Sequence, residues 1–352
     1  MGVAGAYAHL KKVGCEGTPS SPDELKNCHL DVDLLGYCRD AIYRQIRKDM
    51  SDPNAVSIGH YLAAQLQAEG FLPQQTTIFI DGPRPDQKVL AKASRGTQRT
   101  KTIKTIRLNI ASITKKSREG KWSSGTVMKD TMLKVSSLFI LDNQFKSDLK
   151  QGLQAVFASI VLCDGEADTA IAVAQRDHPT VTHDGEALKR VAVSIDSDFL
   201  IYQSIQSVLR KMPQKSEVRF RLYHKTEVMK ALGFGTPLHL LLYGIINTND
   251  YTRSIYTLGL VRNMNIVRSL QGSIESMLAA YIQTANALVD QAGRVALGHF
   301  DLSLTIFYLM RPTYDDVNSQ LDDLMFLEMF VEFIEARDLR LENLPDRSTF
   351  TR

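Results

Sequence analysis

Short runs of β-prone apolar residues alternate with stretches of helical periodicity over the first two thirds of the chain. The runs that we predict as strands lie at 27–33, 75–82, 157–165, 190–198 and 219–224. Between them, apolar residues at helical spacing predict helices at 34–50 and 57–70. Strands that alternate with helices favour an α/β fold, in which a mainly parallel, twisted central sheet is flanked by helices.

The pattern becomes helical from about residue 250, with long amphipathic segments at 273–293 and 319–339. A chain of 352 residues with 44% apolar and 23% charged residues can bury a substantial core. It has no run of 18 apolar residues, no apolar signal core at its start and no CxxC spacing among its four cysteines. We therefore expect a soluble intracellular protein without a zinc site or a disulfide framework.

Positive charge is concentrated in one segment, although the net charge of the whole chain is only +3. Residues 84–121 contain twelve Lys or Arg and two acidic residues. Such a segment is either a solvated basic loop or a surface that binds a polyanion.

Acidic residues follow the predicted strands. The residues expected at the strand ends are Asp31, Asp81, Asp164 and Asp196, followed two positions later by Glu166 and Asp198. The carboxyl ends of neighbouring parallel strands meet at one edge of the sheet, so these carboxylates would converge there. Their repulsion would favour a bound cation, and two Mg²⁺ ions about 4 Å apart could clamp a phosphodiester. The alternative is that each Asp only caps a turn.

The letters DGEA occur twice, at 164–167 and 184–187. The first copy ends a buried apolar run, whereas the second precedes a predicted strand. We therefore place Asp184 and Glu186 in a helix start or a solvent-facing loop, outside the candidate site.

Taken together, the motifs resemble the flap endonuclease family of structure-specific 5′ nucleases, which have a PIN-like fold. The matching stretches are MGVAGAYAHLKKVG, LDVDLLGY, FIDGPRPDQKVLAKASR, CDGEADTAIA, SIDSDFLIY and NTNDYTRSIYTLGLVRNMNIVRSL. They follow the family's order over nearly the whole chain, to about residue 310, and the chain looks like a divergent member.

The resemblance implies seven metal ligands. These are Asp31, Asp81, Asp164, Glu166, Asp196, Asp198 and Asp250. It also implies that Lys88 and Arg95 contact the scissile phosphate and that Tyr37 stacks on the adjacent base. Lys88 and Arg95 are seven residues apart and share one helix face, which Lys92 extends. Asp168 has no counterpart among the ligands.

The resemblance further implies a helical arch, which residues 96–145 would form, and a helix–two-turn–helix element that grips duplex DNA. The residues expected to bind DNA are Lys92, Arg99, Lys101, Lys104, Arg107, Gly259 and Arg262. Thr257 replaces a glycine and Val261 a basic residue of the family hairpin, and the loss of that glycine weakens the expectation of a K⁺ ion there.

We thus predict a nuclease core at 1–270, with 84–145 as basic helix and arch and 248–270 as helix–two-turn–helix, and a helical extension at 271–352. The expected activity is Mg²⁺-dependent cleavage of DNA near a 5′ flap or 5′ single-stranded end, with Mn²⁺ as a substitute ion. We expect a nuclear monomer, with the mitochondrion and cytoplasm as other locations, no membrane contact and no docking to a sliding clamp. The alternatives are a catalytically inactive scaffold for nucleic acid or protein, and a nuclease that acts on RNA.

Overall fold

The structure is a computed structural model, and it describes residues 3–49, 53–82, 89–119, 125–183, 185–213 and 219–308, without the side chains of 89–95, 117 and 297. The chain divides into two compact units. The first consists of Met1–Tyr37, Gln65–Leu90 and Phe157–Tyr314, and the second of Cys38–Ala64, Ala91–Val156 and Asp315–Arg352.

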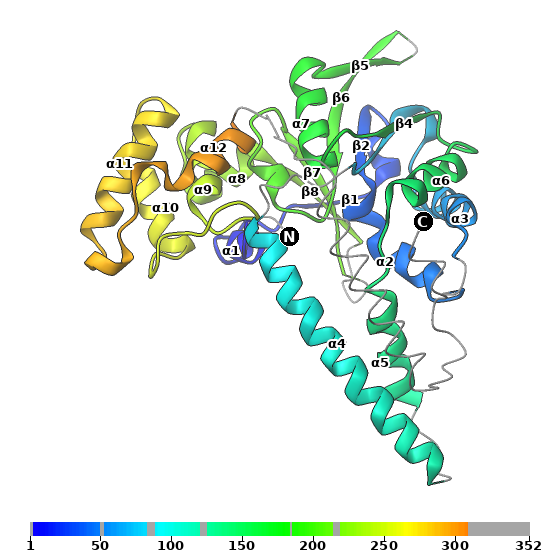
Figure 1. The fold of residues 1–352 in the computed structure, drawn as a ribbon. Coiled ribbons are helices and arrows are strands. Elements are labelled where there is room, and N and C mark those ends of the chain that lie inside the picture. The colour runs from blue at the N-terminus through cyan, green and yellow to red at the C-terminus, as the bar shows by residue number, and fades with distance from the viewer. Residues whose placement is uncertain are drawn as a thin grey trace. The chain divides into compact units, whose positions relative to one another are not determined.

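The described residues of the first unit form one eight-stranded sheet in the order β1-β8-β7-β6-β2-β3-β4, and β5 pairs with β6 (Figure 1). The strands are β1 (Thr18–Ser20), β2 (Cys28–Asp33), β3 (Thr76–Ile80), β4 (Ser159–Leu162), β5 (Thr180–His183), β6 (Glu186–Val193), β7 (Ser207–Lys211) and β8 (Phe220–His224). The five strands β7, β6, β2, β3 and β4 run parallel to one another, whereas the pairs β7–β8, β8–β1 and β6–β5 are antiparallel. This confirms the predicted α/β fold with a mainly parallel central sheet.

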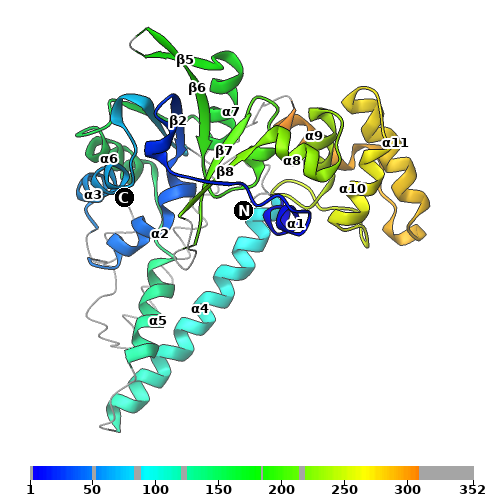
Figure 2. The ribbon, with the colours of Figure 1, turned by 180° about the vertical axis from the view of Figure 1, so that it is seen from behind.

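Helices of the first unit pack around this sheet and form a helical cluster beyond β8 (Figures 1 and 2). The α-helices are α1 (Ala6–Lys12), α7 (Ala167–Asp177), α8 (Lys225–Leu232), α9 (Pro237–Ile246), α10 (Leu260–Arg268), α11 (Ile274–Ala287) and α12 (Asp301–Phe307). The short 3₁₀ helices are η1 (Pro22–Leu25), η2 (Pro73–Gln75), η3 (Asp198–Leu200), η4 (Gln291–Gly293) and η5 (Leu297–Phe300). Apolar side chains of these elements form one core, in which Tyr202, Tyr281 and Phe300 are fully buried.

The second unit is helical. Its helices are α2 (Leu34–Ile46), α3 (Ala55–Ala68), α4 (Val89–Arg118), α5 (Gly125–Ser136) and α6 (Asn143–Leu153). Helices α2 and α4 begin in the first unit, and α3 ends in it. The long helix α4 runs beside α5 in both views (Figures 1 and 2) and buries Ile103, Ile106 and Ile110, while Asn109 Nδ2 donates to Asp130 Oδ2 at 3.2 Å.

The five predicted strands are confirmed, as are the helices expected at 34–50, 57–70 and 273–293, although their ends differ by several residues. Strands β1, β5 and β7 were not predicted, and the helix expected at 319–339 lies outside the described residues. The second DGEA copy lies at the β5–β6 hairpin, where Gly185 adopts φ 84° and Glu186 is exposed; Asp184 lies outside the described residues.

No single helix in the described ranges has both the length and the hydropathy needed to cross a membrane. The pair α8 and α9 reaches that length and hydropathy only when joined, and the two helices are bent by 74°.

Candidate metal and nucleic-acid site

Acidic side chains gather at the carboxyl ends of the parallel strands of the first unit. Asp33 is the last residue of β2, Asp81 follows β3, Glu166 precedes α7 in the turn after β4, and Asp196 and Asp198 follow β6. Because β6, β2, β3 and β4 are adjacent and parallel, these ends meet at one edge of the sheet. We call these five residues the acidic edge.

The Ser194 hydroxyl joins two members of the acidic edge. Its Oγ donates to Asp33 Oδ2 at 2.8 Å and accepts the Asp196 backbone N–H at 3.1 Å. Asp33 Oδ1 also accepts the backbone N–H of Gly36 at 2.9 Å. Further along, the Asp198 N–H donates to Asp196 Oδ1 at 3.3 Å. Both Ser194 and Asp198 are buried, so this part of the edge is fixed by internal hydrogen bonds.

Asp81 lies at the amino-terminal end of α7. Its Oδ1 accepts the Ala167 backbone N–H at 2.7 Å, where the helix dipole favours a negative charge. The neighbouring Gly82 donates its N–H to Gly165 O at 2.6 Å, and a Cβ at Gly82 would lie 2.0 Å from Cys163 O. The absence of a side chain at Gly82 therefore lets the end of β3 and the turn after β4 approach closely.

The acidic edge is electrostatically costly in the absence of a cation. Burial raises the pKa of Asp33 to about 7, and Asp81 and Asp196 add to the rise, against hydrogen bonds from Gly36 and Ser194 that lower it. Burial together with Asp81, Asp33 and Asp168 likewise raises the pKa of the nearby Cys163 thiol to about 12. Both shifts indicate a buried concentration of negative charge.

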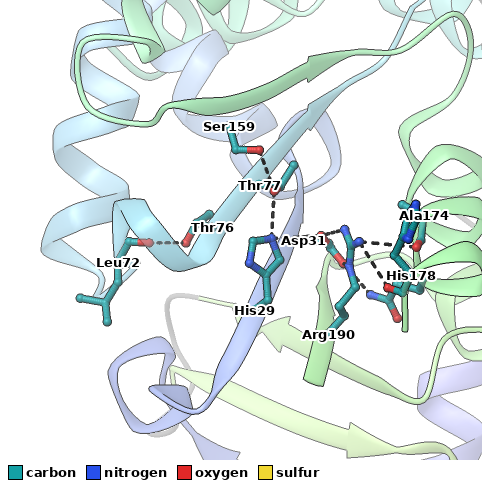
Figure 3. Close-up of polar contacts among 10 residues, drawn as sticks. His29, Asp31, Leu72, Thr76, Thr77, Ser159, Ala174, His178 and Arg190 are labelled. Carbon is teal, nitrogen blue, oxygen red and sulfur yellow. Dashed lines mark hydrogen bonds and ion pairs between the residues drawn. The ribbon is translucent and has the colours of Figure 1, made fainter. Parts of the chain in front are cut away.

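Asp31 does not belong to the acidic edge, and the expectation that it ends its strand is wrong. The strand continues to Asp33, which leaves Asp31 about 7 Å short of the strand end. The Asp31 carboxylate is fully buried and forms a two-pronged ion pair with the Arg190 guanidinium, with Arg190 Nε at 2.8 Å from Oδ2 (Figure 3). Gln175 Nε2 donates to the same Oδ2 at 2.8 Å. An acid neutralised in this way is a poor ligand for a second cation.

The Asp31–Arg190 pair instead anchors α7. Arg190 Nη1 donates to the carbonyls of Ala174 and His178 at the carboxyl-terminal end of that helix, at 3.4 and 3.5 Å (Figure 3). His29 Nε2 lies 3.7 Å from Asp31 Oδ1 and 2.9 Å from Thr77 Oγ1. One end of α7 is thus held by the ion pair and the other end contacts Asp81.

Tyr37 is buried in the first unit, whereas stacking on a base requires an accessible ring. Its side chain is only 5% exposed, and its hydroxyl donates to the Glu69 carboxylate. The ring packs edge-on against Phe71 at 5.5 Å and parallel to Phe220 at 6.4 Å, and Lys211 Nζ lies 4.5 Å from its centre. The ring is therefore packed inside the first unit, and the stacking of Tyr37 on a base stays a prediction.

Other predicted residues occupy varied positions. Asp164 is exposed in the turn after β4, and Asp168, in the first turn of α7, is half-buried. Asp250 is buried in the loop between α9 and α10, and the neighbouring Tyr251 contacts Glu166 through its hydroxyl at 2.9 Å. Lys88 and the side chains of Lys92 and Arg95 lie outside the described residues.

The predicted DNA-binding residues with described side chains lie on two helices. Lys101, Lys104 and Arg107 are exposed on α4, whereas Arg99 is half-buried and donates Nη2 to Leu138 O at 3.4 Å. In the first unit, Gly259 caps α10 at its start and Arg262 is exposed on its first turn. These positions are compatible with phosphate contacts.

The hairpin before α10 keeps a glycine-like backbone without the glycine. Thr257 adopts φ 68°, in the left-handed region that glycine normally occupies. The substitution therefore changes the side chain at the tip of the loop and leaves the backbone conformation accessible. The K⁺ ion expected there stays a prediction.

The chemistry of the acidic edge suits a hard divalent cation. All five side chains offer carboxylate oxygens, the donors that Mg²⁺ prefers, and a cation would offset the burial and the repulsion that raise the pKa of Asp33. In the described part of the chain, no three His, Cys, Asp or Glu side chains form a ready-made cage for an ion. Mg²⁺ bound by one or two carboxylates and several waters does not need such a cage.

No protein-family model and no curated protein matches this sequence. Several solved structures are similar to it. The catalytic core of Rad2 in complex with DNA substrate has 16% identity over 98% of this chain and 100% of that chain, with a TM-score of 0.44. Human GEN1 in complex with Holliday junction DNA has 15% identity over 94% and 73% of the two chains, with a TM-score of 0.49. Flap endonuclease-1 from Methanococcus jannaschii has 13% identity over 95% and 92%, with a TM-score of 0.47.

Proposed function

We propose that the protein is a Mg²⁺-dependent 5′ nuclease that hydrolyses DNA phosphodiesters near a junction between single strand and duplex. The observation that carries the proposal is the convergence of Asp33, Asp81, Glu166, Asp196 and Asp198 at one edge of the parallel sheet. In this proposal Asp33 is the metal ligand of β2, in place of Asp31, which the resemblance implied. Asp164 and Asp250, which lie in adjoining loops, complete the proposed set of ligands.

In this proposal the acidic edge holds two divalent ions, for which Mn²⁺ can substitute. Bound there, the ions would lower the pKa of a water that attacks the phosphorus and would stabilise the charge on the attacking and leaving oxygens. The protein's own part is to hold the carboxylates in place: Ser194 ties Asp33 to Asp196, and the first turn of α7 holds Asp81. Lys88 and Arg95 are proposed to contact the scissile phosphate.

The exposed cations of α4 are proposed to contact the nucleic-acid backbone. Lys101 and Arg107 are six residues apart, about 9 Å along the helix, with Lys104 between them, which is compatible with contacts to successive phosphates. Arg262 at the start of α10 is proposed to contact duplex phosphates. We further propose that the protein acts as a monomer, with the nucleus as its compartment.

The decisive experiment is cleavage of a labelled 5′-flap oligonucleotide by the purified protein in Mg²⁺. Wild type should cleave near the junction, and Asp81→Ala and Asp196→Ala should each reduce the rate by at least about a hundredfold, because each removes a carboxylate from the metal site. Asp40→Ala, which removes an exposed carboxylate of α2 that lies outside the acidic edge, is the matched control and should leave the rate unchanged. Absence of cleavage on flap, nicked and 5′-ended DNA in Mg²⁺ and Mn²⁺ would exclude the DNA nuclease.

The same assay separates the alternatives. Cleavage of RNA but not DNA would identify a nuclease directed at RNA. Nucleic-acid binding with no divalent binding to the acidic edge would identify an inactive scaffold.

The role of α4 is tested by the dependence of DNA affinity on salt. Replacing Lys101 or Lys104 with Gln should lower the slope of log K against log salt by about one, because each removes one phosphate contact. Lys230→Gln, an exposed lysine on α8, is the control and should leave the slope unchanged. Equal slopes for all variants would contradict a role for α4 in binding.

A further inference from the structure

A tyrosine outside the set of acids contacts the acidic edge directly. Tyr251 lies in the loop between α9 and α10, is only 4% exposed, and donates its hydroxyl to Glu166 Oε2 at 2.9 Å. A phenol hydroxyl is a hydrogen-bond donor in the neutral range, and a carboxylate can only accept, so Tyr251 is the donor in this contact.

The surroundings of Tyr251 fix its position. Its backbone N–H donates to Asn249 Oδ1 at 2.9 Å, and Asn249 Nδ2 in turn bonds the Gly244 carbonyl at the end of α9 at 3.1 Å. The ring packs edge-on against Phe307 of α12 at 5.6 Å. Because both the backbone and the ring of Tyr251 are held in place, its hydroxyl can fix the orientation of the flexible Glu166 side chain.

Tyr202 provides an internal comparison, because it shares these surroundings without the same hydrogen bond. Its ring also packs edge-on against Phe307, at 5.3 Å, and its side chain is fully buried. Its hydroxyl, however, pairs with Thr169 Oγ1 at 3.2 Å and not with a carboxylate.

We propose that Tyr251 is a positioning residue of the metal site, which holds the Glu166 carboxylate in the orientation that binds the divalent ion. The inference rests on the proposed function, since it concerns how one ligand of the same site is oriented. Tyr251 acts through Glu166 and contacts neither the ion nor the DNA. The same hydrogen bond connects the loop that carries Asp250 to the residue before α7, so it would also fix the position of Asp250 relative to Glu166.

The test compares Tyr251→Phe with Tyr202→Phe in calorimetric titrations with Mn²⁺, in the absence of DNA. Each change removes one buried hydroxyl, and thermal unfolding reports whether each variant is folded. Tyr251→Phe should weaken metal affinity about tenfold or more, as the loss of a group that orients a ligand does elsewhere, and Tyr202→Phe should leave it unchanged. In the cleavage assay, Tyr251→Phe should need correspondingly more Mg²⁺ for half-maximal rate at an unchanged KM for DNA.

Glu166→Gln gives a second measurement, which does not depend on the stability of one variant. If Tyr251 acts through Glu166, Tyr251→Phe should weaken Mn²⁺ binding much less in the Glu166→Gln protein than in wild type. Equal Mn²⁺ affinities of Tyr251→Phe, Tyr202→Phe and wild type would overturn the inference and leave the nuclease proposal standing. Failure of wild type itself to bind Mn²⁺ would overturn both.

Discussion

The two aspartates of β2 should have opposite effects on stability when each is replaced by asparagine, measured without metal in EDTA at pH 8. The Asp31→Asn change leaves the Arg190 guanidinium, whose side chain is only 8% exposed, without its ionic partner. Loss of one partner from a buried ion pair costs about 3–5 kcal/mol. We expect Asp31→Asn to lower the free energy of unfolding by about 3 kcal/mol, the lower end of that range, because the asparagine still accepts a hydrogen bond.

The Asp33→Asn change should instead stabilise the metal-free protein. A rise of the Asp33 pKa from 3.8 to about 7 corresponds to about 4 kcal/mol of destabilisation at a pH above both values. The asparagine removes this charge but matches the hydrogen bonds from Gly36 and Ser194 less well, at a cost of about 1–2 kcal/mol. The net gain should be about 2 kcal/mol.

The free energy of unfolding should depend on pH through Asp33. Between pH 4 and 7 the folded protein holds a proton on Asp33 that the unfolded chain has released, so this group makes stability fall as pH rises. The advantage of Asp33→Asn over wild type should therefore be small at pH 4 and complete above pH 7. Urea unfolding at several pH values measures it. A destabilised Asp33→Asn at pH 8, or a difference that does not change with pH, would contradict a destabilising negative charge on Asp33.

Three further changes have defined outcomes. Burial lowers the pKa of Lys225 to about 7, so between pH 7 and 10.5 the unfolded chain binds more protons than the folded protein. The free energy of unfolding should therefore rise with pH in that window, and Lys225→Met should flatten the rise in urea titrations. Thr257→Gly should stabilise the protein by up to about 1 kcal/mol by relieving the left-handed backbone, whereas Thr257→Ala should give no gain, and a destabilised Gly variant would contradict the strain. Gly82→Ala should lower the melting temperature and weaken Mn²⁺ binding, because its Cβ would displace the Cys163 carbonyl; unchanged values for both would refute the close approach.

Much of the fold follows from patterns that lie within single segments. The buried strands are predictable because each contains a short cluster of β-prone apolar residues. The acids are predictable because Asp81 comes directly after β3 and Asp196 three residues after β6. The missed strands lack this signal. Strand β1 consists of Thr, Pro and Ser, and β5 of Thr, Val, Thr and His, so only pairing with β8 and β6 makes them strands.

The positions that the sequence misplaced depend on partners far along the chain. Asp31 and Asp33 are two residues apart and share one face of β2, so periodicity alone cannot tell which of them reaches the strand end. Arg190, which is 159 residues away, neutralises Asp31 and so leaves Asp33 as the charged acid at the strand end. Tyr37 is removed from the surface in the same way by Glu69, whose own charge is balanced by Lys211.

Asp31 nevertheless influences the acidic edge, through helix α7. Helix α7 has 11 residues and is about 16 Å long, and Arg190, held by Asp31, binds carbonyls at its carboxyl-terminal end. At its other end the helix receives Asp81 and begins after Glu166. A helix is stiff over three turns, so an ion pair that fixes one end also fixes the direction of the other. Asp31 would then contribute to the site as the anchor of the helix that presents Glu166, which explains why an acid at this position need not bind metal to matter for metal binding.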